Sequence, residues 1–107
     1  MTLDELQLKV KKFVDEKSIG TDVKSRMLDV LSETGELSKE LLKSTGYGKK
    51  SFQTTSSFEN EFGDVLFSLV CLANQTDISF EKVISDAFDK YEKRYQLHNH
   101  IGSIVKK

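Results

Sequence analysis

Residues 56–74 read SSFENEFGDVLFSLVCLAN, and this segment decides the fold. Ser56 and Glu59 have the spacing of a capping box, which predicts that a helix begins here. Its apolar residues nearly encircle a helical wheel, and they are Phe62, Val65, Leu66, Phe67, Leu69, Val70, Cys71, Leu72 and Ala73. A helix that is apolar on all sides has to be buried. A few short helices cannot bury one of their number completely, so we expect this helix to pack against its copy in a homodimer or homotetramer. The alternative is that long neighbouring side chains cover it within one chain.

Helical periodicity marks three further segments. The four predicted helices cover about residues 2–17, 22–44, 56–74 and 79–97. Thr2 with Glu5 forms a second capping box, and Ser79 is placed to cap the last helix. The chain has no proline and little of the alternation typical of strands. We therefore predict an all-α fold of the four-helix bundle type, a single domain over residues 1–107 with helices packing between subunits. The tail from about residue 98 is expected to fray.

Composition limits the classes of function. The 107 residues fit one domain, and 16 Lys+Arg against 17 Asp+Glu give a net charge of −1. This balance argues against a nucleic-acid coat or a membrane-surface module, which would need a basic excess. One cysteine permits no disulfide within the chain, the N-terminus does not read as a signal peptide, and no apolar stretch could span a bilayer. We expect a cytoplasmic protein with neither a nucleic-acid nor a membrane partner.

Two of the predicted helices each carry a pair of acids. Glu61 and Asp64 lie near the start of the apolar helix, and Glu33 and Glu36 lie in the preceding helix. Residues three apart share one face of a helix, with about 5–6 Å between their Cβ atoms. Each pair can therefore present two carboxylates in the same direction.

A glycine stands directly before the second acid of each pair. These residues are Gly35 and Gly63. A glycine inside a helix costs about 1 kcal/mol relative to alanine. Having it twice at the same offset predicts that the two helices, or a ligand, approach closely at this level.

Four carboxylates in one place repel one another unless a cation neutralises them. Oxygen ligands of this kind suit Mg²⁺, with Mn²⁺ as the alternative metal, better than they suit zinc. Solvated surface charges are the other interpretation of such acids. The pair at Glu61 and Asp64 argues against it, because those acids sit on a helix otherwise built for burial.

These motifs resemble a known family. Glu33-Thr34-Gly35-Glu36 followed by Glu61-Phe62-Gly63-Asp64-Val65-Leu66-Phe67 is similar to the ExxE…ExxD signature of the MazG-like nucleotide pyrophosphohydrolases, members of the all-α NTP pyrophosphatase superfamily. The resemblance continues in Leu72-Ala73-Asn74 and in the sequence KYEKRY at residues 90–95, and it covers about residues 22–96. Two acidic pairs on successive helices, with a basic cluster on the next, form a fairly specific combination.

The resemblance implies an activity. The family hydrolyses the bond between the α- and β-phosphates of a nucleoside triphosphate, releasing a monophosphate and pyrophosphate, and this activity would serve nucleotide-pool sanitation. The metal-binding and catalytic acids would be Glu33, Glu36, Glu61 and Asp64. The substrate-binding residues would be Lys90 and Arg94, at family positions that contact phosphates, and Asn74, near the nucleotide. Cations suit that role because they stabilise charge on phosphoryl oxygens. Otherwise Lys90 and Arg94 belong to an exposed basic stripe that pairs with neighbouring acids.

The chain departs from the family pattern at Ser32 and Asn60, where members often carry an additional acid. This difference leaves open whether one or two metals bind, and whether Glu33 or Glu36 acts as the general base. Two other functions also stay open. One is a phosphoribosyl-ATP pyrophosphohydrolase, which is a similar all-helical enzyme. The other is a non-catalytic helical interaction module, although such a module has no need of a glycine beside each acidic pair.

Overall fold

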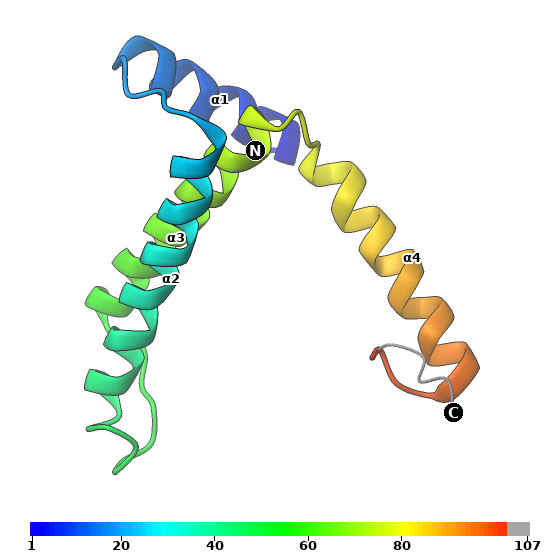
Figure 1. The fold of residues 1–107 in the computed structure, drawn as a ribbon. Helices are drawn as coiled ribbons and strands as arrows, with labels where there is room; N and C mark the ends of the chain where they lie inside the picture. Colours follow the sequence, from blue (N-terminus) through cyan, green and yellow to red (C-terminus); the bar gives the residue numbers. More distant parts are fainter. Residues whose placement is uncertain (103–107) are drawn as a thin grey trace.

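The computed structural model describes residues 1–102, which form four α helices and no strand. The helices are α1 (Leu3–Glu16), α2 (Val23–Ser44), α3 (Ser56–Gln75) and α4 (Phe80–His98) (Figure 1). The predicted all-α class is confirmed, with each predicted helix within a few residues of its observed bounds. Within these residues, no helix is long and apolar enough to cross a membrane.

Side-chain caps fix where the helices begin. At α1 the Thr2 hydroxyl accepts a hydrogen bond from the Glu5 amide at 3.0 Å, and the Glu5 carboxylate accepts one from the Thr2 amide at 3.1 Å. Asp22 caps α2, and Ser79 caps α4 by accepting from the Lys82 amide at 3.2 Å. Each cap satisfies an amide that has no partner within its own helix.

The predicted capping box at Ser56 and Glu59 is wrong by one residue. The N-cap of α3 is Thr55, whose extended backbone places its hydroxyl to accept from the Phe58 amide at 3.1 Å. Ser56 is instead the first residue of the helix. Adjacent Thr55 and Ser56 are both good caps, so the composition alone could not choose between them.

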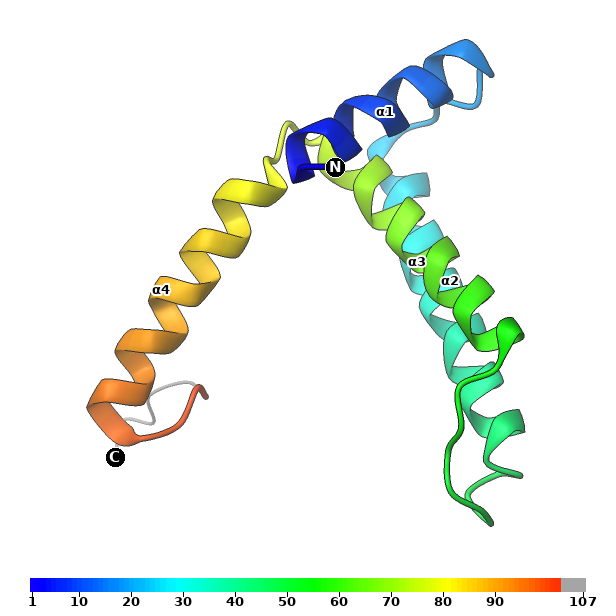
Figure 2. The same ribbon diagram turned by 180° about the vertical axis from the view of Figure 1, so that it is seen from behind.

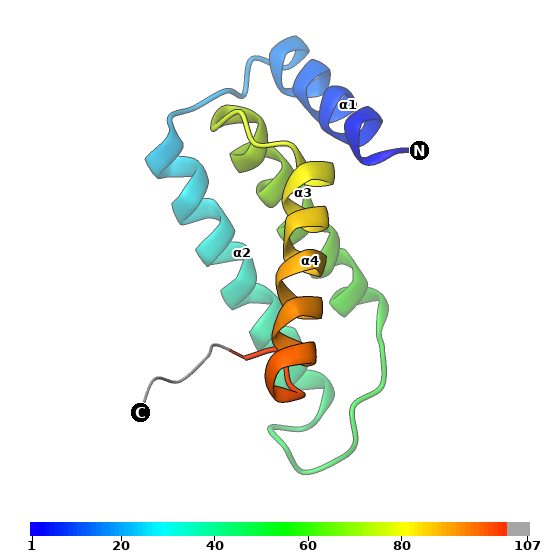
Figure 3. The ribbon, with the colours of Figure 1, turned by 90° about the vertical axis from the view of Figure 1, so that its right-hand side faces the viewer.

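Helices α2 and α3 form an antiparallel pair, and α1 lies across the end of that pair where α3 finishes (Figures 1 and 3). The buried core sits at this end. It consists of Val10, Val70 and Cys71, with Leu6, Val14, Phe67 and Phe80 packed against it. The opposite end of the pair is closed by the loop between α2 and α3 (Figure 3). The core therefore fixes one end of α3, and the acids of α3 lie toward the other end.

Helix α4 leaves this end and diverges from the α2–α3 pair (Figure 2). It has no buried residue and no extended packing against α2 or α3. The radius of gyration is 17.3 Å, whereas a compact domain of this length has about 13 Å. The accessible surface is 8341 Å², against about 6,100 Å² for a compact monomer of this mass. The single chain is thus an open arrangement of its four helices.

Burial of α3 is incomplete in the single chain. Val70 is fully buried, but Phe62, Leu66 and Leu69 are 55%, 44% and 42% exposed. Neighbouring side chains of the same chain do not cover these residues, so packing between subunits stays a prediction. The predicted frayed tail is described only in part: α4 ends at His98, Asn99 follows with a left-handed backbone (φ 63°), and residues 103–107 lie outside the described residues.

Candidate active site

Three of the four predicted acids lie together. One carboxylate oxygen each from Glu33, Glu61 and Asp64 lies within 4.8 Å of the other two. Glu33 comes from α2 and the other two come from α3, and the antiparallel pairing of these helices places them opposite each other. Glu33 and Glu61 are half-buried, whereas Asp64 is exposed. The group therefore has one side in the helix pair and one side open to a ligand.

The fourth predicted acid, Glu36, lies outside this group. Its side chain is exposed, one turn beyond Glu33 on α2. A further acid that the sequence analysis did not single out, Glu40, is half-buried close enough to act on the charge of Glu61. Glu40 follows Glu33 by seven residues, which is two helical turns. That spacing on the α2 face that meets α3 is the signal that could have found it.

The electrostatics of the group centre on Glu61. Desolvation raises the pKa of the Glu61 carboxyl above its ordinary value, and the negative charges of Asp64, Glu33, Glu36 and Glu40 raise it further. A bound divalent cation would reverse this effect by favouring the ionised form. Three carboxylates and no nitrogen or sulfur donor form a set that suits a hard cation such as Mg²⁺. The residues present therefore fit the predicted metal.

The raised pKa of Glu61 predicts a pH dependence of stability. The native state holds this proton more tightly than the unfolded chain does. The free energy of unfolding of the metal-free protein should therefore fall as pH rises from the ordinary glutamate pKa through the raised native pKa. Glu61→Gln should remove most of this decline, because a neutral amide has no charge to bury or repel. Urea unfolding in EDTA across this pH range measures the effect, and parallel curves for the two proteins would contradict it.

The glycines of the two motifs do not mark a close approach of α2 to α3. A Cβ built on Gly35 or on Gly63 meets no atom within 4 Å. Each glycine follows the first acid of its motif by two residues, which is about 200° around the helix, so it points away from the facing acids. The expectation that the two helices approach closely there is therefore wrong within one chain. The close approach of a ligand at this level stays a prediction.

The predicted phosphate-binding residues lie on α4, apart from these acids. Because α4 diverges from the α2–α3 pair, Lys90 and Arg94 are carried away from the carboxylates of their own chain (Figure 1). Lys90 lies over the ring of Tyr91, 4.9 Å from its centroid, and the guanidinium of Arg94 donates to the Ile101 carbonyl at 3.2 Å. Neither is in an ion pair within residues 1–102. The ion pair found on α4 within the described residues joins Lys82 to Asp86.

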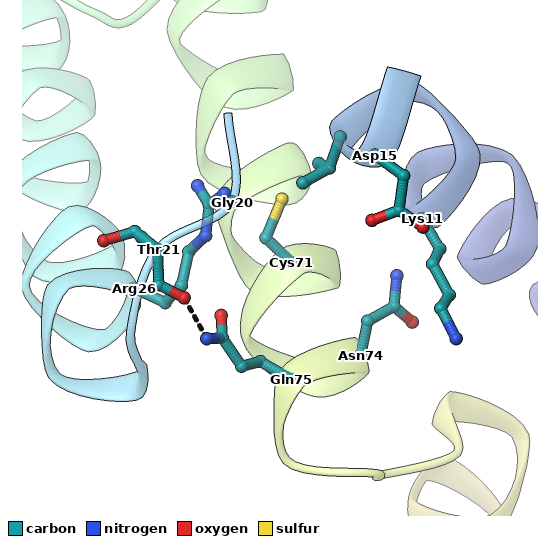
Figure 4. A pocket seen from close by; sticks show the side chains of 9 residues that line it. Lys11, Asp15, Gly20, Thr21, Arg26, Cys71, Asn74 and Gln75 are labelled. Atoms are coloured by element: carbon teal, nitrogen blue, oxygen red, sulfur yellow. Dashed lines mark hydrogen bonds between the residues drawn. The ribbon is translucent and has the colours of Figure 1, made fainter. Parts of the chain in front are cut away.

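Asn74 lies at the core end of α3. It is thirteen residues beyond Glu61, or about 20 Å along the helix axis. Its side chain is hydrogen-bonded to Gln7 of α1. It also borders a pocket of about 210 Å³, together with Lys11, Arg26 and Gln75 (Figure 4). Direct contact between Asn74 and the nucleotide stays a prediction.

Comparison with known proteins decides the family. The model of the MazG nucleotide pyrophosphohydrolase domain matches residues 22–99, which include all the acids of the candidate site. The chain belongs to this family. The members of the MazG family are hydrolases of nucleotides, so the chain is assigned to the nucleotide pyrophosphohydrolases.

Similar proteins come from Bacillus. The chain is 36% identical over 97 residues to YpjD of Bacillus subtilis (strain 168), an uncharacterized protein, with 87% of this chain and 86% of YpjD covered. Two crystal structures share the MazG-like fold with a TM-score of 0.72 each. One is the Bacillus-conserved MazG protein, described as a nucleotide pyrophosphohydrolase, at 27% identity over 85% of this chain and 89% of that one. The other is B. subtilis YpjD, described as a candidate pyrophosphatase, at 33% identity over 85% and 95%.

Proposed function

We propose that this MazG-family protein is a Mg²⁺-dependent pyrophosphohydrolase that cleaves the bond between the α- and β-phosphates of nucleoside or deoxynucleoside triphosphates. The observation that carries the proposal is the group of three carboxylates from two packed helices, with Glu61 at its centre. A half-buried acidic group of this kind favours binding of a divalent cation together with the phosphates that the cation attracts. Nucleotide-pool sanitation is the cellular role that fits such an activity.

Each acid has a part in this proposal. Glu33, Glu61 and Asp64 would hold the cation, and the bound cation would attract the triphosphate to this side of the helix pair. When bound, Mg²⁺ polarises a phosphoryl oxygen and lowers the pKa of a bound water. Glu36 lies one turn from Glu33 and outside the group of three, so its carboxylate is left to accept the proton of the attacking water. The chemistry then needs cations on the far side of the phosphates to stabilise the negative charge that builds there.

The direct test measures pyrophosphate release from a panel of canonical and modified ribo- and deoxyribonucleoside triphosphates, with Mg²⁺ and with EDTA. We expect metal-dependent release of equal amounts of pyrophosphate and monophosphate. Release of orthophosphate instead would contradict cleavage at the α–β bond. The panel includes phosphoribosyl-ATP, and turnover of that compound alone would identify the protein as a phosphoribosyl-ATP pyrophosphohydrolase instead. Absence of turnover on every compound would overturn the proposal.

We further propose that the active form is a homo-oligomer in which α4 packs on another copy of the chain. The apolar stripe of α4 is largely uncovered: Phe88 is 68% exposed and Tyr95 is 55% exposed. An apolar pocket of about 460 Å³ lies in the angle between α3 and α4. On the side of α2, Leu28 and Leu31 are 63% and 66% exposed. These exposed apolar side chains support the proposal of an interface, because the same faces on two copies can cover each other.

This arrangement would also complete the site. Lys90 and Arg94 cannot serve the acids of their own chain while α4 points away from them. When α4 crosses to a second copy, it brings these two cations toward the phosphates held at that copy's acids. The proposed active site therefore takes its carboxylates from one chain and its cations from another.

A further inference from the structure

A side-chain network joins three parts of the chain at the core end. The Gln7 carboxamide of α1 donates from Nε2 to Asn74 Oδ1 at 3.1 Å and to the Ile78 carbonyl at 2.8 Å. Its Oε1 accepts from the Phe80 amide at 2.8 Å. In return, Asn74 Nδ2 donates to the Gln7 carbonyl at 2.9 Å. Both N–H groups of the Gln7 carboxamide are thus used, and Gln7 contacts the turn on either side of Ser79.

The place of this network gives it control over α4. Phe80 is the first residue of α4, and the turn before it contains Asp77 with a left-handed backbone (φ 57°). Helix α4 has no buried residue and packs mainly against α1. Within one chain nothing in the described structure packs along the length of α4, so the direction in which α4 reaches a second copy is set where the helix begins. The Gln7 carboxamide is bonded to both sides of this starting point.

We infer that Gln7 and Asn74 are a positioning pair that sets the direction of α4 and thereby the position of Lys90 and Arg94 in the assembled active site. On this inference Asn74 acts through Gln7, in place of the direct contact with the nucleotide that the family resemblance implies. Its amide and its carbonyl are both bonded to Gln7, and it lies about 20 Å along α3 from Glu61. A small rotation at the start of α4 becomes a displacement of several ångströms after three turns. The inference depends on the proposed function, because it assigns the cations to that reaction.

The test compares Gln7→Met, Asn74→Ala and the double variant by steady-state kinetics. Gln7→Met keeps a side chain of similar shape and removes the three hydrogen bonds of the Gln7 carboxamide, leaving only the bond from Asn74 Nδ2 to the backbone carbonyl of residue 7. We expect each single variant to lower kcat/KM by roughly 10- to 100-fold, because misplaced groups lose catalytic power steeply with distance. The effects of residues that act as one unit are not additive, so the kcat/KM of the double variant should be no lower than that of the less active single variant. Lys9→Ala, at an exposed position of the same helix, is the control and should match the wild type.

Two kinetic results would overturn the inference. Wild-type kinetics for Gln7→Met would show that the network does not position anything the reaction needs. A loss in Asn74→Ala much larger than in Gln7→Met, with the two losses multiplying in the double variant, would indicate that Asn74 contacts the substrate directly.

A distance measurement separates failure of this inference from failure of the proposed function. Spin labels on Lys39→Cys of α2 and Glu92→Cys of α4, in a Cys71→Ser background diluted with unlabelled chain, report the direction of α4 without any catalysis. Gln7→Met should shift or broaden the distance distribution, and Lys9→Ala should not. An unchanged distribution in Gln7→Met overturns the inference. If the wild type hydrolyses no nucleotide yet the distribution shifts, the proposed function fails while the control of α4 by Gln7 stands.

Discussion

Glu61→Gln should abolish Mg²⁺-dependent turnover while leaving the four helices intact. Glu61 is one of the two half-buried members of the three-carboxylate group, and the negative charges of its acidic neighbours raise its pKa. The substitution keeps the shape of the side chain but removes a charged oxygen ligand and the charge that attracts the cation. Loss of one well-placed electrostatic group typically lowers kcat by about 10²- to 10³-fold, and loss of a metal ligand should reach the upper end of that range.

The measurement is pyrophosphate release at saturating substrate, with circular dichroism to verify the helices. Glu59→Gln is the matched control, because Glu59 is exposed in the first turn of α3 and belongs to no part of the acidic group. It should retain wild-type activity. If Glu61→Gln turned over at the rate of the Glu59→Gln control, Glu61 would have no place in the site.

Mixing two inactive variants should restore activity if the site is shared between chains. One variant is Glu61→Gln, and the other carries Lys90→Ala with Arg94→Ala. In a mixed dimer, the intact acids of one chain face the intact cations of the other, so one of the two sites is whole. Random exchange into dimers would then recover about one quarter of the wild-type activity. The measurement is pyrophosphate release after unfolding and refolding the variants together in equal amounts.

The opposite arrangement gives a different result. If each chain used its own Lys90 and Arg94, every chain in the mixture would carry a defect and no activity would return. Each variant refolded alone is the control for activity regained by refolding itself. A double variant with wild-type kinetics would instead leave Lys90 and Arg94 as an exposed basic stripe.

The helices could be predicted from the sequence because their signals are local. The cap of α1 depends on Thr2 and Glu5, three residues apart, and Ser79 caps α4 over the same separation. The pair of Glu61 and Asp64 is equally local, since three-residue spacing on a helix fixes a shared face. Glu36 has the same spacing from Glu33 but lies outside the group of three carboxylates. Even the error at α3 is small, because two good capping residues stand side by side at Thr55 and Ser56.

The spatial relations could not be predicted in the same way. Gln7 and Asn74 lie sixty-seven positions apart in sequence, and no pattern in either segment indicates their hydrogen bonds. The convergence of Glu33 with Glu61 was expected from the paired motifs and from the resemblance, but spacing within each helix does not fix it, because it depends on how α2 and α3 are aligned. The direction of α4 could not be predicted from the sequence either. An apolar stripe indicates that one face of a helix is covered, but it does not indicate which chain covers that face.

Gly35 and Gly63 lower the stability of their helices but leave space beside them. Each lies on the outward side of its helix, where a Cβ would meet nothing in the single chain. Alanine at either position would therefore strengthen the isolated helix by about 1 kcal/mol. If a second backbone lies against these positions in the assembly, the same methyl group would hold that backbone away from α2 or α3. The space left by the two glycines would then be a condition for assembly, and the chain would give up helix stability for a close contact between subunits.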